Sequence, residues 1–80
     1  MAVLRLFAGA REAAGTGRDE VPGGTVAAVL AGARSRYGES FSDVLEHCAI
    51  WCNGEPCELD QPVGDRDEVA VLPPVSGGSG

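Results

Sequence analysis

The sequence of 80 residues contains no lysine, and its six basic residues are all arginine, against twelve acidic residues. The formal net charge of -6 argues against a nucleic-acid or anionic-membrane surface as a partner, because such partners select basic patches. The charge is unevenly placed. Residues 1–38 hold five Arg and three acids, and residues 39–80 hold one Arg and nine acids. We therefore expect the acidic half to face a basic surface on any partner that it meets.

Long apolar runs are also missing. No run approaches the roughly 20 residues that cross a bilayer. Residues 1–15 lack the apolar segment of a signal peptide and are interrupted by charges, so we expect a cytoplasmic protein without a membrane partner. A chain of 80 residues with 44% hydrophobic residues is long enough for one small globular domain.

The sequence offers little for an active site or a metal centre. It has one His, His47, beside Cys48, and neighbours on a strand point to opposite faces, so they form no nucleophile–base pair. Cys48 and Cys52 would lie about 13 Å apart along a strand, too far for one metal ion. With Cys57 the number of cysteines is odd, which argues against a disulfide framework in a cytoplasmic chain. We expect buried, unreactive thiols and no bound metal or cofactor.

Hydrophobic periodicity predicts strands mixed with one good helix, which is typical of an α+β domain. Thr25 is the expected cap of that helix and Gly38 its end. The predicted strands are 2–7, 18–21, 48–52, 57–59 and 68–72. The predicted helices are 8–14, 26–37 and 41–46. The residues with inward parity, which should form the core, are Leu4, Leu6, Val26, Val29, Leu30, Ala33, Tyr37, Leu45, Ile50, Cys52, Val69 and Val71.

The chain ends in a glycine-rich segment. Pro73 and Pro74 remove two backbone donors, so the sheet must end there, and we predict a domain over 1–74 with a flexible tail over 75–80. Gly77 and Gly78 have no side chains, so such a tail can enter a narrow channel in another protein. A terminal carboxylate is ionised and unreactive until a partner enzyme activates it, for example by adenylation with ATP.

Three stretches of the sequence resemble one family. Residues 7–15 (FAGAREAAG) resemble the F-A-x-x-R-E-x-x-G start of the MoaD/ThiS family, and Asn53-Gly54-Glu55 stands where the family has its V-N-G-E turn. Residues 64–78 are similar to the ending G-D-x-D-E-V-A followed by P-P-V-x-G-G. The resemblance covers residues 1 to 78 and is strongest with MoaD, the small subunit of molybdopterin synthase.

The resemblance implies a β-grasp, ubiquitin-like fold and a sulfur carrier rather than an enzyme. A MoeB-like activating enzyme would adenylate Gly78 with ATP and magnesium, and a sulfur donor would convert it to a thiocarboxylate. A MoaE-like large subunit would then use that sulfur to make molybdopterin. Carriers for cysteine, thiazole or sulfur-containing natural products stay open as alternatives, as do a protein modifier and an inert interaction module. Without lysine, the chain cannot form lysine-linked chains of itself.

Ser79-Gly80 depart from the family's Gly-Gly ending. Three interpretations stay open. A metalloprotease trims the chain to Gly78, or the two residues are a remnant of a linker, or the chain is used as written or has lost its carrier chemistry.

Strand parity predicts a docking surface. In a β-grasp sheet the first, last and third strands lie side by side, so Phe7, Leu72 and Trp51 should form one exposed apolar patch on its outer face. Together with Pro73, Pro74 and Val75, these are the expected partner-binding residues. The acids expected to form a charged rim that steers a basic partner are Asp60, Asp65, Asp67 and Glu68. We also expect Arg11 to hold the first helix against that acidic loop.

Overall fold

Five strands form one mixed sheet in the computed structural model, which describes residues 1–73. The strands are β1 (Ala2–Leu6), β2 (Arg18–Val21), β3 (Ala49–Cys52), β4 (Glu55–Pro56) and β5 (Glu68–Leu72). Their order across the sheet is β2-β1-β5-β3-β4. The first and last strands run parallel to each other in the middle, and the other three pairings are antiparallel.

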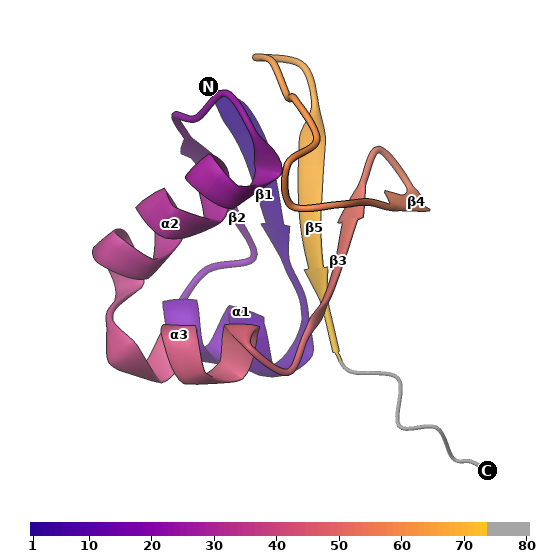
Figure 1. Ribbon diagram of the computed structural model, residues 1–80. Coiled ribbons are helices and arrows are strands. Elements are labelled where there is room, and N and C mark those ends of the chain that lie inside the picture. The colour runs from indigo at the N-terminus through magenta and orange to yellow at the C-terminus, as the bar shows by residue number, and fades with distance from the viewer. Residues whose placement is uncertain (74–80) are drawn as a thin grey trace, which may run out of the picture.

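Three helices lie together on one side of this sheet (Figure 1). They are α1 (Ala8–Ala14), α2 (Val26–Tyr37) and α3 (Glu39–Leu45). The predicted α+β class and β-grasp architecture are confirmed. The bounds of α2 agree with the sequence because its end signals are strong: the Thr25 hydroxyl oxygen accepts a hydrogen bond from Ala28 N at 3.1 Å, and the backbone turns at Gly38 with a φ of 94°.

The core fills the space between the helices and the inner face of the sheet. Ten of the twelve predicted core residues are buried, and the other two, Tyr37 and Ile50, are half-buried and pack against the core. Sequence reasoning missed Ala2, Ala10, Val21, Phe41 and Val63. Phe41 is the largest fully buried side chain, and its ring meets Tyr37 edge-on at 5.2 Å between centroids.

The return strand after β3 begins earlier than predicted. Asn53 and Gly54 have φ values of 53° and 85°, the left-handed conformation that a two-residue hairpin turn requires. This turn places Glu55 directly opposite Cys52, so β4 is Glu55–Pro56 and not 57–59. Proline has no N–H to donate, and it is tolerated here because β4 is an edge strand.

The loop between β4 and β5 is bonded to the start of α2. Ala27 N donates to Leu59 O at 2.8 Å, Val26 N to Gln61 O at 3.0 Å, and Val63 N to Gly24 O at 3.0 Å. The first two bonds satisfy amide groups that the first turn of a helix leaves without partners, and the third ties the loop to the residue before the helix cap. None of the helices in the described part of the chain is long and apolar enough to cross a membrane.

Candidate docking site

The outer face of the sheet carries the predicted apolar residues, and the register brings them together. Across β5, Ala70 lies opposite Trp51, and Leu72 lies opposite Ala49. Phe7 follows Leu6, the partner of Val71, and therefore lies beside Leu72. We call Phe7, Ala49, Trp51, Ala70 and Leu72 the outer patch. None of the three helices covers it (Figure 1).

The exposure of the outer patch agrees with the parity argument. Phe7 is 38% exposed, and Trp51 and Leu72 are half-buried, while Val69 and Val71 on the other face of β5 are fully buried. Trp51 is absent from the side chains that pack against the core, so it does not lie under a helix. Contiguous exposed apolar patches on small proteins mark interaction sites. The role of these residues in binding stays a prediction.

Phe7 is held in place by its neighbours. Its backbone N donates to Val71 O at 3.2 Å, which extends the pairing of β1 with β5 by one residue. The Arg5 guanidinium carbon lies 5.6 Å from the centre of the Phe7 ring, within the range of a cation–π contact. Immediately afterwards Ala8 adopts a φ of 51°, and this left-handed residue turns the chain from the outer face into α1.

The outer patch borders the point where the chain leaves the sheet. Pro73 directly follows Leu72 and is exposed. Pro74, Val75, Gly77 and Gly78, the remaining predicted site residues, lie outside the described residues. A protein that covers the outer patch would therefore contact the chain at the start of its C-terminal segment.

The expected acidic rim is largely engaged in local contacts. Asp65 forms an ion pair with the Met1 amino group, and the Glu68 carboxylate accepts from Arg5 at 3.1 Å. Asp67 accepts from Gly64 N at 2.7 Å and from the Asn53 side chain at 3.0 Å. The hydrogen bonds from the Met1 amine and from Gly64 N lower the pKa values of Asp65 and Asp67, respectively, below that of a free Asp.

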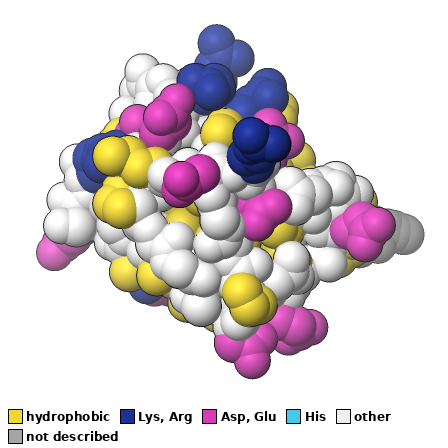
Figure 2. All heavy atoms as spheres, turned by 90° about the horizontal axis from the view of Figure 1, so that it is seen from above, with side chains coloured by type: hydrophobic (Ala, Val, Ile, Leu, Met, Phe, Trp, Pro, Cys, Tyr) yellow, Lys and Arg dark blue, Asp and Glu magenta, His cyan; other side chains and the backbone are white. Residues whose placement is uncertain are grey.

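Of the four predicted rim residues, only Asp60 has no contact of this kind among the hydrogen bonds and ion pairs of residues 1–73, and it is exposed. In the view onto the end of the molecule, acidic side chains are scattered with arginines among them and do not form one block (Figure 2). These contacts weaken the expected steering of a basic partner.

Arg11 is not placed where the sequence suggested. It belongs to α1, next to the Leu6 end of β1, whereas the acidic loop adjoins the other end of that strand, where Val3 N donates to Asp67 O. A Cβ added to Gly17 would lie 3.4 Å from Arg11 Nε, so the arginine lies beside that loop residue. Arg11 therefore cannot hold α1 against residues 65 to 68.

The thiols offer no reactive centre. All three cysteines are free; Cys52 is buried, and Cys48 and Cys57 are half-buried. Burial raises the pKa of each thiol above its usual value, so the thiols stay protonated at neutral pH and are weak nucleophiles. His47 is exposed. Within residues 1–73, no three His, Cys, Asp or Glu side chains come together in a way that could hold a metal ion.

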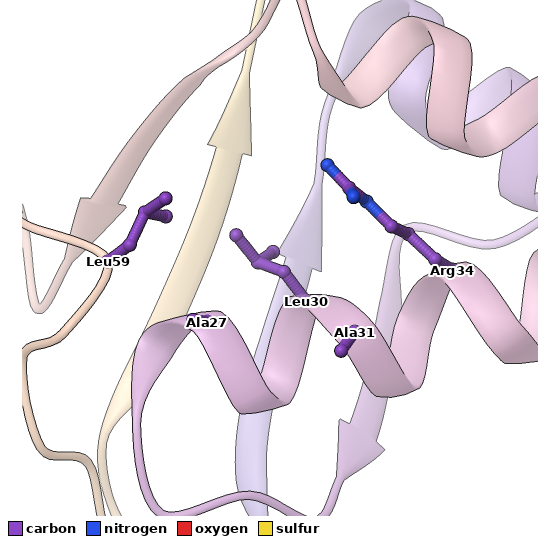
Figure 3. A pocket seen from close by; sticks show the side chains of 5 residues that line it. All are labelled: Ala27, Leu30, Ala31, Arg34 and Leu59. Atoms are coloured by element: carbon purple, nitrogen blue, oxygen red, sulfur yellow. The ribbon is translucent and has the colours of Figure 1, made fainter.

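A shallow pocket of about 120 Å³ lies on the other side of the molecule, between α2 and the loop before β5 (Figure 3). Ala27, Leu30, Ala31, Arg34 and Leu59 line it. Four apolar side chains and one arginine supply neither a general base nor a nucleophile, so the pocket has no machinery for catalysis.

Sequence reasoning missed the polar neighbours of the outer patch, Arg5 and Arg18. The signal for Arg5 was available, since Arg5 is two residues before Phe7 and shares its parity on β1. Arg18 lies directly opposite Arg5 in the antiparallel pairing of β1 with β2. That pairing could not be derived from the pattern of either strand.

Comparisons with known proteins agree on one family. The model of the ThiS family matches residues 4–78. No curated protein matches the chain at a significant level. Small archaeal modifier protein 1 (SAMP1) from Methanosarcina acetivorans is 30% identical with a TM-score of 0.85, covering 96% of this chain and 95% of that one.

Two further solved structures show the same similarity. SAMP1 from Haloferax volcanii is 32% identical with a TM-score of 0.77, covering 96% of this chain and 98% of that one. A putative molybdopterin converting factor, subunit 1, from Pyrococcus furiosus is 27% identical with a TM-score of 0.79, covering 92% of this chain and 97% of that one.

Proposed function

The chain belongs to the ThiS family of small ubiquitin-like sulfur carriers, and we propose that it carries sulfur as a thiocarboxylate on Gly78. A MoeB-like enzyme would activate the Gly78 carboxylate, which displaces pyrophosphate from ATP in the presence of magnesium. A sulfur donor would then displace AMP and leave the thiocarboxylate. The chain would be a cosubstrate and not an enzyme.

The observation that carries this proposal is the outer patch next to the start of the tail. An activating enzyme must bind the folded domain while the terminal carboxylate reaches its active site. Phe7, Trp51 and Leu72 supply an apolar surface for that binding, and aromatic side chains are enriched among the residues that dominate binding energy. The three thiols within residues 1–73 are protonated at neutral pH and therefore compete poorly with the terminus as nucleophiles.

For the pathway we propose molybdopterin synthesis, with a MoaE-like large subunit as the protein that accepts the thiocarboxylate. The P-P-V-S-G-G ending and the similarity to the Pyrococcus furiosus protein support this assignment. Carriers for cysteine, thiazole or other sulfur-containing products would use the same terminal chemistry with another synthase.

A second function, conjugation to other proteins as a modifier, is favoured by the similarity to two small archaeal modifier proteins. Activation of Gly78 would be the same, but an amine of a target protein would displace AMP. Because the 80 residues contain no lysine, the modifier could not be extended into lysine-linked chains of itself.

The test is a loading assay followed by intact mass. The chain is incubated with a MoeB-like enzyme from the same genome, ATP, magnesium and a sulfur donor, in its 80-residue form and truncated after Gly78. We expect the truncated form to exchange one oxygen for sulfur. The 80-residue form should load about a hundredfold more slowly, because Ser79 and Gly80 displace the reacting carboxyl from its position.

Gly78→Ala in the truncated form is the matched variant, since it should fold normally and load poorly. Equal loading of the two lengths would eliminate trimming by a protease. A covalent adduct on another protein instead of sulfur would favour the modifier. Loading of neither form by any activating enzyme would leave the inert module.

A further inference from the structure

Two arginines lie side by side on the outer face of the sheet. The register places Arg18 of β2 opposite Arg5 of β1, and Arg5 opposite Ala70 of β5, which in turn lies opposite Trp51. One row across the sheet therefore runs from two guanidinium groups into the outer patch. We call Arg5 and Arg18 the arginine pair. It stands out on a molecule with a net charge of -6.

The arginine pair has N–H donors that the contacts within residues 1–73 do not use. Arg5 Nη1 donates to Glu68 at 3.1 Å, and both side chains are 42% exposed. Arg18 lies 3.7 Å from Glu20, and its side chain is 59% exposed, so this contact is weak. A guanidinium carries five N–H donors. Among the contacts of residues 1–73, most N–H groups of the arginine pair therefore have no acceptor in the free protein and face water.

A protein that covers the outer patch also removes water from its neighbour Arg5. Buried donors without acceptors, and buried charges without partners, oppose binding strongly. Glu68 already balances the charge of Arg5, whereas the contact of Arg18 with Glu20 is long and exposed, so Arg18 remains able to pair with one carboxylate of a partner. A carboxylate can also accept two parallel hydrogen bonds from one guanidinium group. Glu20 and Glu68 beside the pair disfavour a polyanion such as nucleic acid.

We propose that the arginine pair recognises a carboxylate side chain on the activating enzyme that docks on the outer patch. This inference rests on the proposed function and adds the chemistry of the partner: an apolar surface bordered, on the side of β2, by an Asp or Glu. The outer patch supplies affinity and the arginine pair supplies selectivity. An acidic group on the partner is the opposite of the basic partner surface that the sequence led us to expect.

The test is steady-state activation of the chain, truncated after Gly78, by the purified MoeB-like enzyme, with the concentration of the chain varied. Arg18→Glu and Arg5→Gln should each raise KM by about tenfold or more, because each removes a charge-assisted contact. The value of kcat should not change, since the reacting carboxyl is unaltered. Arg34→Glu is the matched control, because Arg34 is an exposed arginine of α2 on the other side of the sheet.

Two further measurements complete the design. Thermal unfolding shows whether each variant is folded. A charge reversal of the candidate acid on the enzyme should restore a low KM with Arg18→Glu and raise it with the unaltered chain. Unchanged KM for both arginine variants, while the unaltered chain loads, would overturn the inference and leave the carrier function intact. Failure of the unaltered chain to load would overturn both.

Discussion

The two faces of the sheet are built from the same strands and differ in what covers them. On β5, Val69 and Val71 point to the inner face and are fully buried, whereas Ala70 and Leu72 point outward and are half-buried. Three helices and the core lie over the inner face, and none of them lies over the outer patch. Residues that are neighbours along a strand thus belong to surfaces with different tasks.

The difference shows how a chain of 80 residues divides its apolar side chains. So small a domain needs its inner face for stability, because it buries only about 60% of the surface of the unfolded chain. An outer face that is apolar but uncovered contributes less to folding and remains available for a partner. The inner face should therefore be sensitive to substitution in stability, and the outer face in binding.

A matched pair of Leu→Ala substitutions tests the difference between the two faces most directly. Leu6→Ala removes a fully buried side chain of the inner face and should lower the free energy of unfolding by about 2–5 kcal/mol. Leu72→Ala makes the same change on the outer face and should lower it by less than about 1 kcal/mol. Urea unfolding of both variants measures the difference.

The same pair should behave in the opposite way in binding. Leu72→Ala should raise the KM of the chain for its activating enzyme, while Leu6→Ala should leave KM unchanged in any fraction that remains folded. Equal losses of stability in the two variants would show that the outer patch is part of the core and would remove the basis of the docking site.

The helical layer over the inner face is fastened to the sheet by a polar cluster. The Tyr37 hydroxyl at the end of α2 donates to the Asp19 carboxylate on β2, and Arg36 Nη1 donates to the same oxygen at 2.8 Å. Tyr37→Phe removes one hydrogen bond to a charged, partly exposed acceptor and should cost about 1–2 kcal/mol in urea unfolding. An unchanged midpoint would show that the Tyr37 hydroxyl does not help to hold α2 on the sheet.

The cluster also predicts a dependence on pH. The hydrogen bonds from Tyr37 and Arg36 lower the pKa of Asp19 below that of a free Asp, so its contribution to stability is present above about pH 4 and is lost as the pH falls. Burial and the Asp19 carboxylate raise the pKa of Tyr37 to about 12, so its contribution is full below pH 10 and is lost as the pH rises through 12.

Asp19→Asn provides the check, since it should flatten the acid limb of the stability profile below about pH 4 relative to the unaltered chain. An unchanged acid limb would assign the loss of stability at low pH to other carboxylates.

Most of the fold was predictable because its signals are local. Thr25, Gly38 and the apolar stripe between them define α2, and alternation along β1 and β5 assigns their two faces. Phe41 was missed because α3 has only seven residues, too few to display a helical period. The return strand was misplaced because Pro56 argues against a strand except at an edge.

The apolar part of the candidate site was also predictable, but the partners of its charged residues were not. Parity placed Phe7, Trp51 and Leu72 on one face. The ion pair of Arg5 with Glu68 joins residues 63 positions apart and depends on the parallel pairing of the first and last strands. The partners of the acidic loop likewise come from distant parts of the chain, such as Met1 for Asp65. Composition alone therefore misjudged the charge that a partner meets.

The smallest expected effect on the free energy of unfolding comes from a substitution where the chain passes from the outer to the inner face of the sheet. Phe7 ends the outer face, and Ala8, with its φ of 51°, turns the chain into α1 on the inner side. A left-handed alanine is strained by about 1–2 kcal/mol. Glycine removes this strain, but it also gives the unfolded chain more conformational freedom, which cancels part of the gain in stability. Ala8→Gly should therefore raise the free energy of unfolding by up to about 1 kcal/mol.

Ala31→Gly is the control for this substitution, because Ala31 is exposed in the middle of α2, where glycine should cost about 1 kcal/mol. The two identical changes should thus shift the urea midpoint in opposite directions. If Ala8→Gly also raises KM for the activating enzyme, the fixed turn serves to hold Phe7 in the outer patch. A midpoint lowered as much as that of Ala31→Gly would show that residue 8 has ordinary helical backbone and that Phe7 is presented without strain.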